Sequence, residues 1–273
     1  MNKFQKIIKY VAIAFAVYLA ICIIGAIVTG VLAISTGMFG ISLIKDSVED
    51  QAIEGVQYLE GFSKLDLEIV ASNLKIKAEG ESYRVEYSQV SESTKIGNND
   101  GTLKITDDRK IITPTNGGII TIYVPEGTAL EEIELEMGAG NVNIENINSK
   151  KVDFSFGAGS VGVKNLVSAN AKIECGAGQV IIEDSDLTNT ELDTGVGKLV
   201  FSGYMKGKSN VNCGIGEVDL ILAGGADLYT IDADKGIGDI KINGNKVGDE
   251  SITGNGENKV SIDGGIGSIE VNM

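Results

Sequence analysis

The sequence predicts an all-β parallel β-solenoid, a coil of short strands built from 19-residue repeats, preceded by one N-terminal transmembrane helix. Two observations predict this arrangement: glycine pairs recur at a fixed interval, and a long apolar segment lies near the N-terminus. A third is the combination of 36 glycines with 2 prolines. Repeated tight backbone corners raise the glycine content alone, whereas loop-rich chains raise both residues.

The apolar segment carries no charged residue from Tyr10 to Ile44. Its densest part, Ile7 to Ile34, is long enough to cross about 30 Å of hydrocarbon as a helix. A secretory signal peptide is the alternative, but its apolar region spans only about 7–15 residues and ends at a cleavage site of small residues. We therefore expect a transmembrane helix that binds the lipid bilayer.

Charges on either side of the apolar segment predict its orientation. Three lysines precede it, whereas all 38 acidic residues follow it. Because positive charge is retained on the cytoplasmic side, the N-terminus is expected in the cytoplasm and the C-terminal domain outside the cell. Residues 1–44 then form a basic tip and the membrane helix, and residues 45–57 a juxtamembrane linker. We therefore expect a single-pass protein of the cell membrane.

Composition excludes several functions. The formal charge of −15 argues against nucleic acid as a partner. The chain has no histidine, which removes Ser/His/Asp and Cys/His nucleophile systems and histidine-based zinc sites. We expect no catalytic residue, no cofactor and no enzymatic activity.

The glycine pairs define the repeat. The first five Gly-x-Gly pairs recur at one constant interval, from Gly138 to Gly214, and two more follow at longer intervals, at Gly236 and Gly265. The last interval contains a polar insertion, which a surface loop tolerates. These structural corner glycines are Gly138, Gly140, Gly157, Gly159, Gly176, Gly178, Gly195, Gly197, Gly214, Gly216, Gly236, Gly238, Gly265 and Gly267.

Apolar residues alternate with polar ones on both sides of each pair, which is typical of strands. The apolar positions lie three residues before the first glycine and four and six residues after it, as in Leu135, Val142 and Ile144. We expect these three columns to point inward. The residue between the glycines, small in Ala139 and larger in Ile266, is expected to form a further inward layer at the corner.

One repeat unit cannot bury its apolar face alone, so neighbouring units must stack into a common core. Residues 131–273 are expected to form the regular solenoid and residues 58–130 irregular starting rungs that cap it. Within that cap, Leu67–Ile76 can be aligned with Leu135–Ile144. Met273 follows the last strand directly, which predicts a bare C-terminal edge. An antiparallel sandwich is the structural alternative.

The segments Ile119–Thr128 and Leu130–Ile144 resemble the putative-adhesin domains of bacterial surfaces, found especially in Gram-positive bacteria. The likeness spans Tyr58 to Met273. It implies a right-handed β-helix of unknown function, held by one N-terminal span or coupled to envelope-stress systems. The motifs of this family are structural, so the resemblance implies no catalytic residue.

Acidic residues dominate the outward positions two and four residues before each first glycine. Carboxylates stacked at the spacing of the rungs repel one another, which a divalent cation or a basic partner relieves. Weak Ca²⁺ binding or docking of a basic surface is one hypothesis, and a solvated face is the favoured alternative. This acidic strip is Glu134, Glu136, Asp153, Glu174, Glu191, Asp193, Asp232, Asp234 and Asp263.

Cysteines outside the cell invite a disulfide. Cys175 and Cys213 lie two repeats apart, which places them about 9.6 Å from each other, beyond the limit of about 7 Å between the Cα atoms of a disulfide. We expect free, buried thiols. Cys22 is expected within the membrane span.

These observations favour a membrane-anchored extracellular β-solenoid that serves as an adhesin or as a scaffold or sensor of the cell envelope. Its expected partner is an envelope protein or a surface ligand. The alternatives are a carbohydrate-active β-helix enzyme and a regulatory subunit of an envelope-stress membrane complex.

Overall fold

The computed structural model describes residues 52–107, 118–248 and 251–273. The predicted cytoplasmic tip and membrane span, Cys22, and most of the predicted linker lie outside the described residues. Within the described parts of the chain, no helix has both the length and the apolar character that a membrane crossing requires.

Almost all described elements are strands, and the one helix is a single 3-10 turn, η1 (Ala226–Leu228). Fifteen strands form one continuous sheet. They are β1 (Ala52–Tyr58), β2 (Lys64–Ala78), β3 (Arg84–Ser91), β4 (Thr94–Asn99), β5 (Thr102–Asp107), β6 (Gly118–Val124), β7 (Ala129–Glu145), β8 (Asn148–Lys164), β9 (Val167–Thr188), β10 (Thr190–Lys206), β11 (Lys208–Leu222), β12 (Tyr229–Ile242), β13 (Asn245–Lys246), β14 (Ser251–Gly254) and β15 (Asn258–Asn272).

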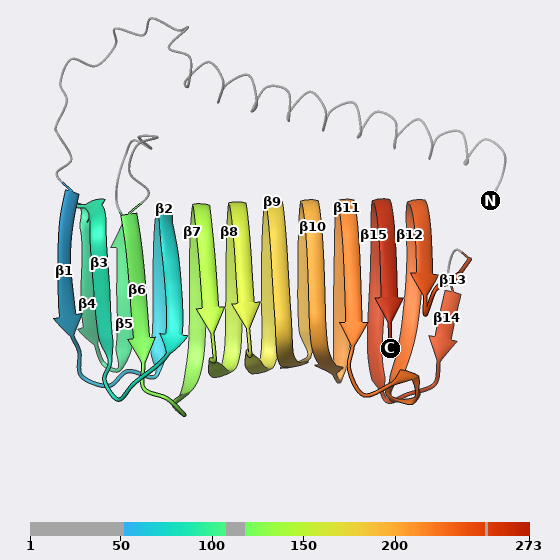
Figure 1. Ribbon diagram of the computed structural model, residues 1–273, viewed down its shortest axis with the longest axis horizontal. Coiled ribbons are helices and arrows are strands. Elements are labelled where there is room, and N and C mark those ends of the chain that lie inside the picture. Colours follow the sequence, from blue (N-terminus) through green and yellow to red (C-terminus); the bar gives the residue numbers. More distant parts are fainter. Residues whose placement is uncertain (1–51, 108–117, 249–250) are drawn as a thin grey trace, which may run out of the picture. The chain divides into compact units, whose positions relative to one another are not determined.

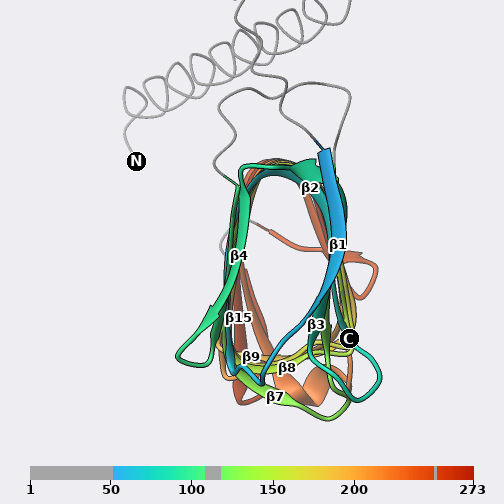
Figure 2. The ribbon, with the colours of Figure 1, turned by 90° about the vertical axis from the view of Figure 1, so that its left-hand side faces the viewer.

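The glycine repeats stack in parallel, as the sequence predicts. Each long strand bends at its glycine pair, so that its two arms form opposite walls joined by an arch (Figures 1 and 2). Successive rungs pair with a shift of one repeat; Gly140 pairs with Gly159, and Gly159 with Gly178. The fold is all-β and consistent with a β-solenoid. Its right-handed winding stays a prediction.

The core lies between the two walls. The three apolar columns expected to point inward are buried in every copy, and in the first copy they are Leu135, Val142 and Ile144. The second glycine of each pair has a φ between +129° and +153°, a backbone conformation that favours glycine.

The prediction for the residue between the glycines is wrong. Ala158 and Ala177 are exposed in the middle of the stack. The inward positions on either side of the corner, such as Phe156 and Val161, are five residues apart. An odd separation cannot be bridged by strict alternation, so the bend leaves the residue between the glycines on its outer side.

A second corner of the coil was not foreseen. Asn146, Asn165 and Asp184 have left-handed φ values of 59°, 54° and 51° on successive rungs. Asn and Asp tolerate this conformation better than other residues with a side chain. The amide of Asn165 also donates to the Asn146 side-chain oxygen at 2.8 Å, which links the rungs along this edge.

The order of the last rungs differs from their order in the chain. The final strand, β15, lies between β11 and β12 and pairs in parallel with both (Figure 1). β12 is therefore the outermost full rung, and the expectation of a bare edge at Met273 is wrong. The short strands β13 and β14 pair antiparallel with β12 and cover part of its outer edge.

Antiparallel strands also cover the opposite end of the stack. β2 pairs in parallel with β7, with Leu67 opposite Leu135 and Ile76 opposite Ile144, which confirms the alignment of these two segments. β5 and β6 together form the next rung beyond β2. The antiparallel strands β4, β3 and β1 then close this end. The exact domain boundaries stay predictions.

Candidate functional site

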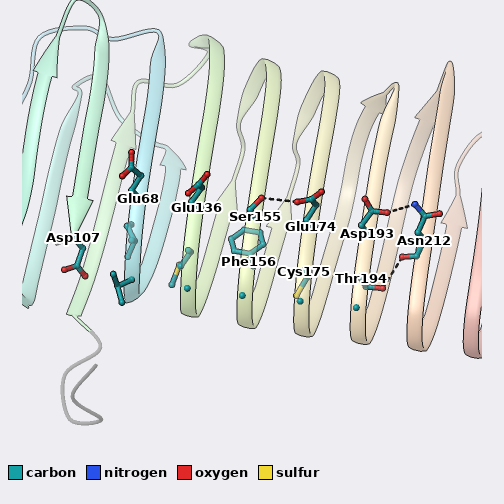
Figure 3. A pocket seen from close by; sticks show the side chains of 17 residues that line it. Glu68, Asp107, Glu136, Ser155, Phe156, Glu174, Cys175, Asp193, Thr194 and Asn212 are labelled. Carbon is teal, nitrogen blue, oxygen red and sulfur yellow. Dashed lines mark hydrogen bonds between the residues drawn. The ribbon is translucent and has the colours of Figure 1, made fainter. Parts of the chain in front are cut away.

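A groove of about 950 Å³ crosses six rungs, from β2 through β7, β8, β9 and β10 to β11. It lies on the arm that leads into the glycine corner, and Figure 3 shows its side chains in two rows. One row is polar and outward, and the other is largely buried and forms the floor. Floor and corner residues are Ile69, Val70, Met137, Gly138, Phe156, Gly157, Cys175, Gly176, Thr194 and Gly195, and Asp107 of β5 stands at one end.

The polar row continues over the eight rungs from β2 to β12, and we call it the acid line. Its members lie two residues before the first corner glycine, or before Val70 at the matching position of β2, and each is paired in register with the next. Six of the eight carry a carboxylate. In spatial order they are Glu68, Glu136, Ser155, Glu174, Asp193, Asn212, Asp263 and Asp234.

The remaining acidic residues predicted from the sequence form a second, parallel row four residues before the first glycine. Basic and neutral residues interrupt this row, because Lys172 lies between Asp153 and Glu191. The structure therefore divides the predicted acidic strip into two rows, and the row nearer the corner lines the groove with Glu136, Glu174 and Asp193. The second row contains Glu134, Asp153, Glu191 and Asp232.

Hydrogen-bond donors moderate the repulsion along the acid line. Lys172 lies 2.8 Å from Glu174, and this contact, helped by the Ser155 hydroxyl at 3.3 Å, holds the pKa of Glu174 below its usual value. The amide of Asn212 donates to the Asp193 carboxylate. Lys104 bridges Glu68 at 2.9 Å and Asp66 at 2.7 Å. The acid line is therefore acidic, and hydrogen bonds and ion pairs hold several of its carboxylates in place.

The floor beneath the acid line is apolar at Met137 and Phe156 and ends in the hydroxyl of Thr194, which donates to the Asn212 carbonyl oxygen at 3.4 Å. Cys175 is buried in this floor, and burial raises the pKa of its thiol. Thr194 lies between Cys175 and Cys213 in the ladder, and both cysteines are free. The prediction of free, buried thiols is confirmed for this pair.

The chemistry that this site offers is charge, hydrogen bonding and apolar contact. Its carboxylates follow one another along a line, whereas acid–base hydrolysis of glycosides needs two that face each other across a bond. No group of three or more metal-ligating side chains occurs within residues 52–107, 118–248 and 251–273. Weak Ca²⁺ binding by the acidic strip stays a prediction.

Sequence reasoning missed two acidic members of the groove, Glu68 and Asp107. Glu68 joins the acid line because β2 lies in register with β7, and the alignment of Leu67–Ile76 with Leu135–Ile144 contained that signal. Ser155 and Asn212 occupy the correct column but are uncharged. Asp107 reaches the groove from β5, which no repeat pattern relates to the glycine corners.

Solved structures with a similar arrangement include a putative cell adhesion protein from Clostridium sporogenes, at 21% identity and a TM-score of 0.42, over 81% of this chain and 99% of that one. A putative adhesin from Bacteroides fragilis shares 15% identity at a TM-score of 0.35, over 82% and 97% of the two chains. A putative lipid binding protein from Parabacteroides distasonis shares 14% identity at a TM-score of 0.38, over 80% of this chain and 96% of that one.

Among curated proteins, none matches the chain. The model of the family described as Toastrack DUF4097 matches residues 62–272. This range begins just before β2, includes every corner glycine and ends at the last residue of β15. The chain therefore belongs to the Toastrack DUF4097 family, a family of domains of unknown function.

Proposed function

We propose that this chain is a single-pass membrane protein that presents its β-solenoid outside the cell as an adhesin-like binding surface, and that it catalyses no reaction. The observation that carries the proposal is the groove along the acid line. It repeats one kind of contact over six rungs, which suits an extended ligand or a partner surface.

The anchor and its orientation rest on the sequence. The uncharged segment from Tyr10 to Ile44 supports one membrane span, and the three lysines before it support a cytoplasmic N-terminus. The resemblance of residues Tyr58 to Met273 to putative-adhesin domains of bacterial surfaces agrees with a position at the cell surface. Serving as a scaffold or sensor of the envelope requires the same placement.

Surface labelling tests the placement. A membrane-impermeant amine reagent applied to intact cells is expected to modify Lys150, whose side chain is 74% exposed. Lys3, before the predicted span, is expected to react only after lysis. Modification of Lys150 that also requires lysis would contradict the proposal.

A second experiment tests binding against catalysis. The full chain in phosphatidylcholine nanodiscs is incubated with a panel of cell-wall and host glycans, and both retention and new reducing ends are measured. Retention without cleavage is expected. New reducing ends that disappear in a Glu136→Gln/Glu174→Gln variant would instead support a carbohydrate-active enzyme, since these carboxylates line the groove.

A further inference from the structure

The residues between the corner glycines, together with Ala71 between Val70 and Ser72 of β2, form a continuous apolar line on the outside of the arch, which we call the apolar ridge. Each member is paired in register with the next, so the line follows the stack from β2 to β12. Side-chain size increases along it. In spatial order the ridge is Ala71, Ala139, Ala158, Ala177, Val196, Ile215, Ile266 and Ile237.

The large end of the ridge is accessible to solvent. Ile237 is 48% exposed. Val196, Ile215 and Ile266 are half-buried, yet none of the three belongs to the side chains that pack on the core of the described chain. Adjacent rungs bring these branched side chains within about 4.8 Å of one another, so they cover each other in part. A contiguous row of solvent-accessible apolar side chains outside the core is a candidate interaction site.

The acid line runs beside the ridge along its whole length. The two lines are offset by three residues on every rung, so their backbones are at most about 10 Å apart. At the large end of the ridge the neighbouring members are Asp193, Asn212, Asp263 and Asp234. On the other side of the ridge stand Glu217 and Asp239, with lysine partners at 3.0 Å and 2.8 Å. Carboxylates therefore flank the apolar side chains on the side of the acid line, whereas the row on the other side carries mixed charge, with Lys198 beside Val196.

We propose that the apolar ridge and the acid line together dock a cationic amphipathic helix. Charge complementarity selects this partner, because its apolar stripe contacts the ridge while its basic stripe contacts the acid line. The dimensions agree: a helix is about 10 Å wide, and its pitch of about 5.4 Å is close to the rung spacing of about 4.8 Å. The proposal names the partner class for the binding function proposed above and rests on it.

Two other occupants fit the surface less well. An anionic bilayer would bring lipid phosphates against the six carboxylates of the acid line, and like charges repel. A second copy in an antiparallel two-fold arrangement would place one acid line against the other. Only a basic partner buries the ridge and neutralises the acid line at the same time.

The test measures the affinity of an amphipathic helical peptide of leucine and lysine, labelled for fluorescence anisotropy, for the full chain in phosphatidylcholine nanodiscs. Empty nanodiscs provide the background. Because the ridge lies outside the core, Ile215→Ser/Ile266→Ser is expected to keep the melting temperature and to weaken binding about tenfold or more. The matched control is Ile252→Ser, which changes a 71% exposed isoleucine of β14 and is expected to bind as the parent chain does.

Two further arms test the electrostatic part. Asp263→Asn/Asp234→Asn is expected to weaken binding and to flatten its salt dependence. A peptide with glutamate in place of lysine is expected not to bind. A peptide with serine in place of leucine is expected to bind at least tenfold more weakly. This serine peptide measures the apolar contribution even if the isoleucine variant of the protein fails to fold.

Equal affinity of the parent chain and the isoleucine variant would overturn the proposal. Binding of anionic vesicles by the protein in a lipid-free preparation would also overturn it. So would self-association of the protein that added peptide does not reduce. Glycan retention without peptide binding would refute this inference and leave the proposed binding function standing.

Discussion

A Cβ atom on Gly178 would collide with the backbone carbonyl oxygen of Gly159, the matching glycine of the preceding rung. Gly178 also has a φ of +140°, which residues with a side chain rarely adopt. The same relation recurs between Gly197 and Gly178. The glycine corner is therefore a requirement of stacking and would be needed whatever the solenoid binds.

Gly178→Ala is expected to lower the free energy of unfolding by on the order of 3 kcal/mol, because it combines backbone strain with overpacking against a neighbouring strand. Urea unfolding followed by circular dichroism measures the change. The matched control is Ala177→Ser, which alters the adjacent exposed residue and is expected to stay within about 0.5 kcal/mol. Equal stability of the two variants would show that the corner yields to a side chain.

The repeat was predictable from the sequence because the fold uses one residue type at one position in each copy. Leu67 and Leu135 face each other as expected, and the columns of Val142 and Ile144 are buried as expected. The order of the last rungs was not predictable. β12 and β15 carry the same pattern of corner glycines and apolar columns, so either strand can pair with the edge of β11. The length of the loop between β12 and β15 allows β15 to take the place beside β11.

The acid line was predictable for the same reason as the core, since period-two alternation assigns residues to faces. The groove beside it was not. Its floor depends on how the arch bends, and one end is formed by Asp107 from a rung that lacks the glycine pair. The apolar ridge was assigned to the wrong side because alternation does not continue through a corner, as the exposed Ala177 shows.

The position of β15 predicts a specific pattern of unfolding. Val260 is fully buried and pairs with Ser209 on β11 and Ile231 on β12. Val260→Asp places a carboxylate in the core, which costs several kcal/mol. Because β15 connects β12 to the rest of the stack, hydrogen exchange is expected to accelerate throughout β12 although its sequence is unchanged.

The neighbouring variant Ser261→Asp changes an exposed residue of the same strand and controls for the added charge. Its exchange rates in β12 are expected to match those of the parent chain. If Val260→Asp left β12 protected, then β12 would be held by β11 directly, in the order of the chain, and the observed insertion of β15 would be wrong.

The burial of the thiols predicts that they react slowly with thiol reagents. Burial raises the pKa of Cys175, and a raised pKa leaves less of the reactive thiolate at a given pH. Labelling of the folded chain with a maleimide near pH 8 is expected to be at least tenfold slower at Cys175 than in the urea-unfolded chain. The variant Cys175→Ser, which lacks this thiol, shows how much of the labelling comes from Cys175. Fast labelling in the folded state would show that the floor of the groove opens.

The ion pairs between rungs predict a small dependence of stability on pH. Lys151 at 2.8 Å and Lys64 at 3.3 Å donate to Glu132 and hold the pKa of its carboxyl below the usual value. A depressed folded-state pKa stabilises the fold above the unfolded-state pKa of about 4.3, and this contribution disappears as the pH falls through the folded-state value. Because Glu132 is 30% exposed, the contribution is expected to be below about 1 kcal/mol.

Glu132→Gln is therefore expected to lower the free energy of unfolding near pH 7 and to lower it by less near pH 3, as measured by urea unfolding at both values. Glu131→Gln is the matched control. The Glu131 carboxylate lies 3.7 Å from Lys150 and is 52% exposed, so its removal is expected to change little at either pH. A deficit of Glu132→Gln that did not shrink near pH 3 would assign the effect to lost packing, since protonation of the carboxylate removes the ion pairs.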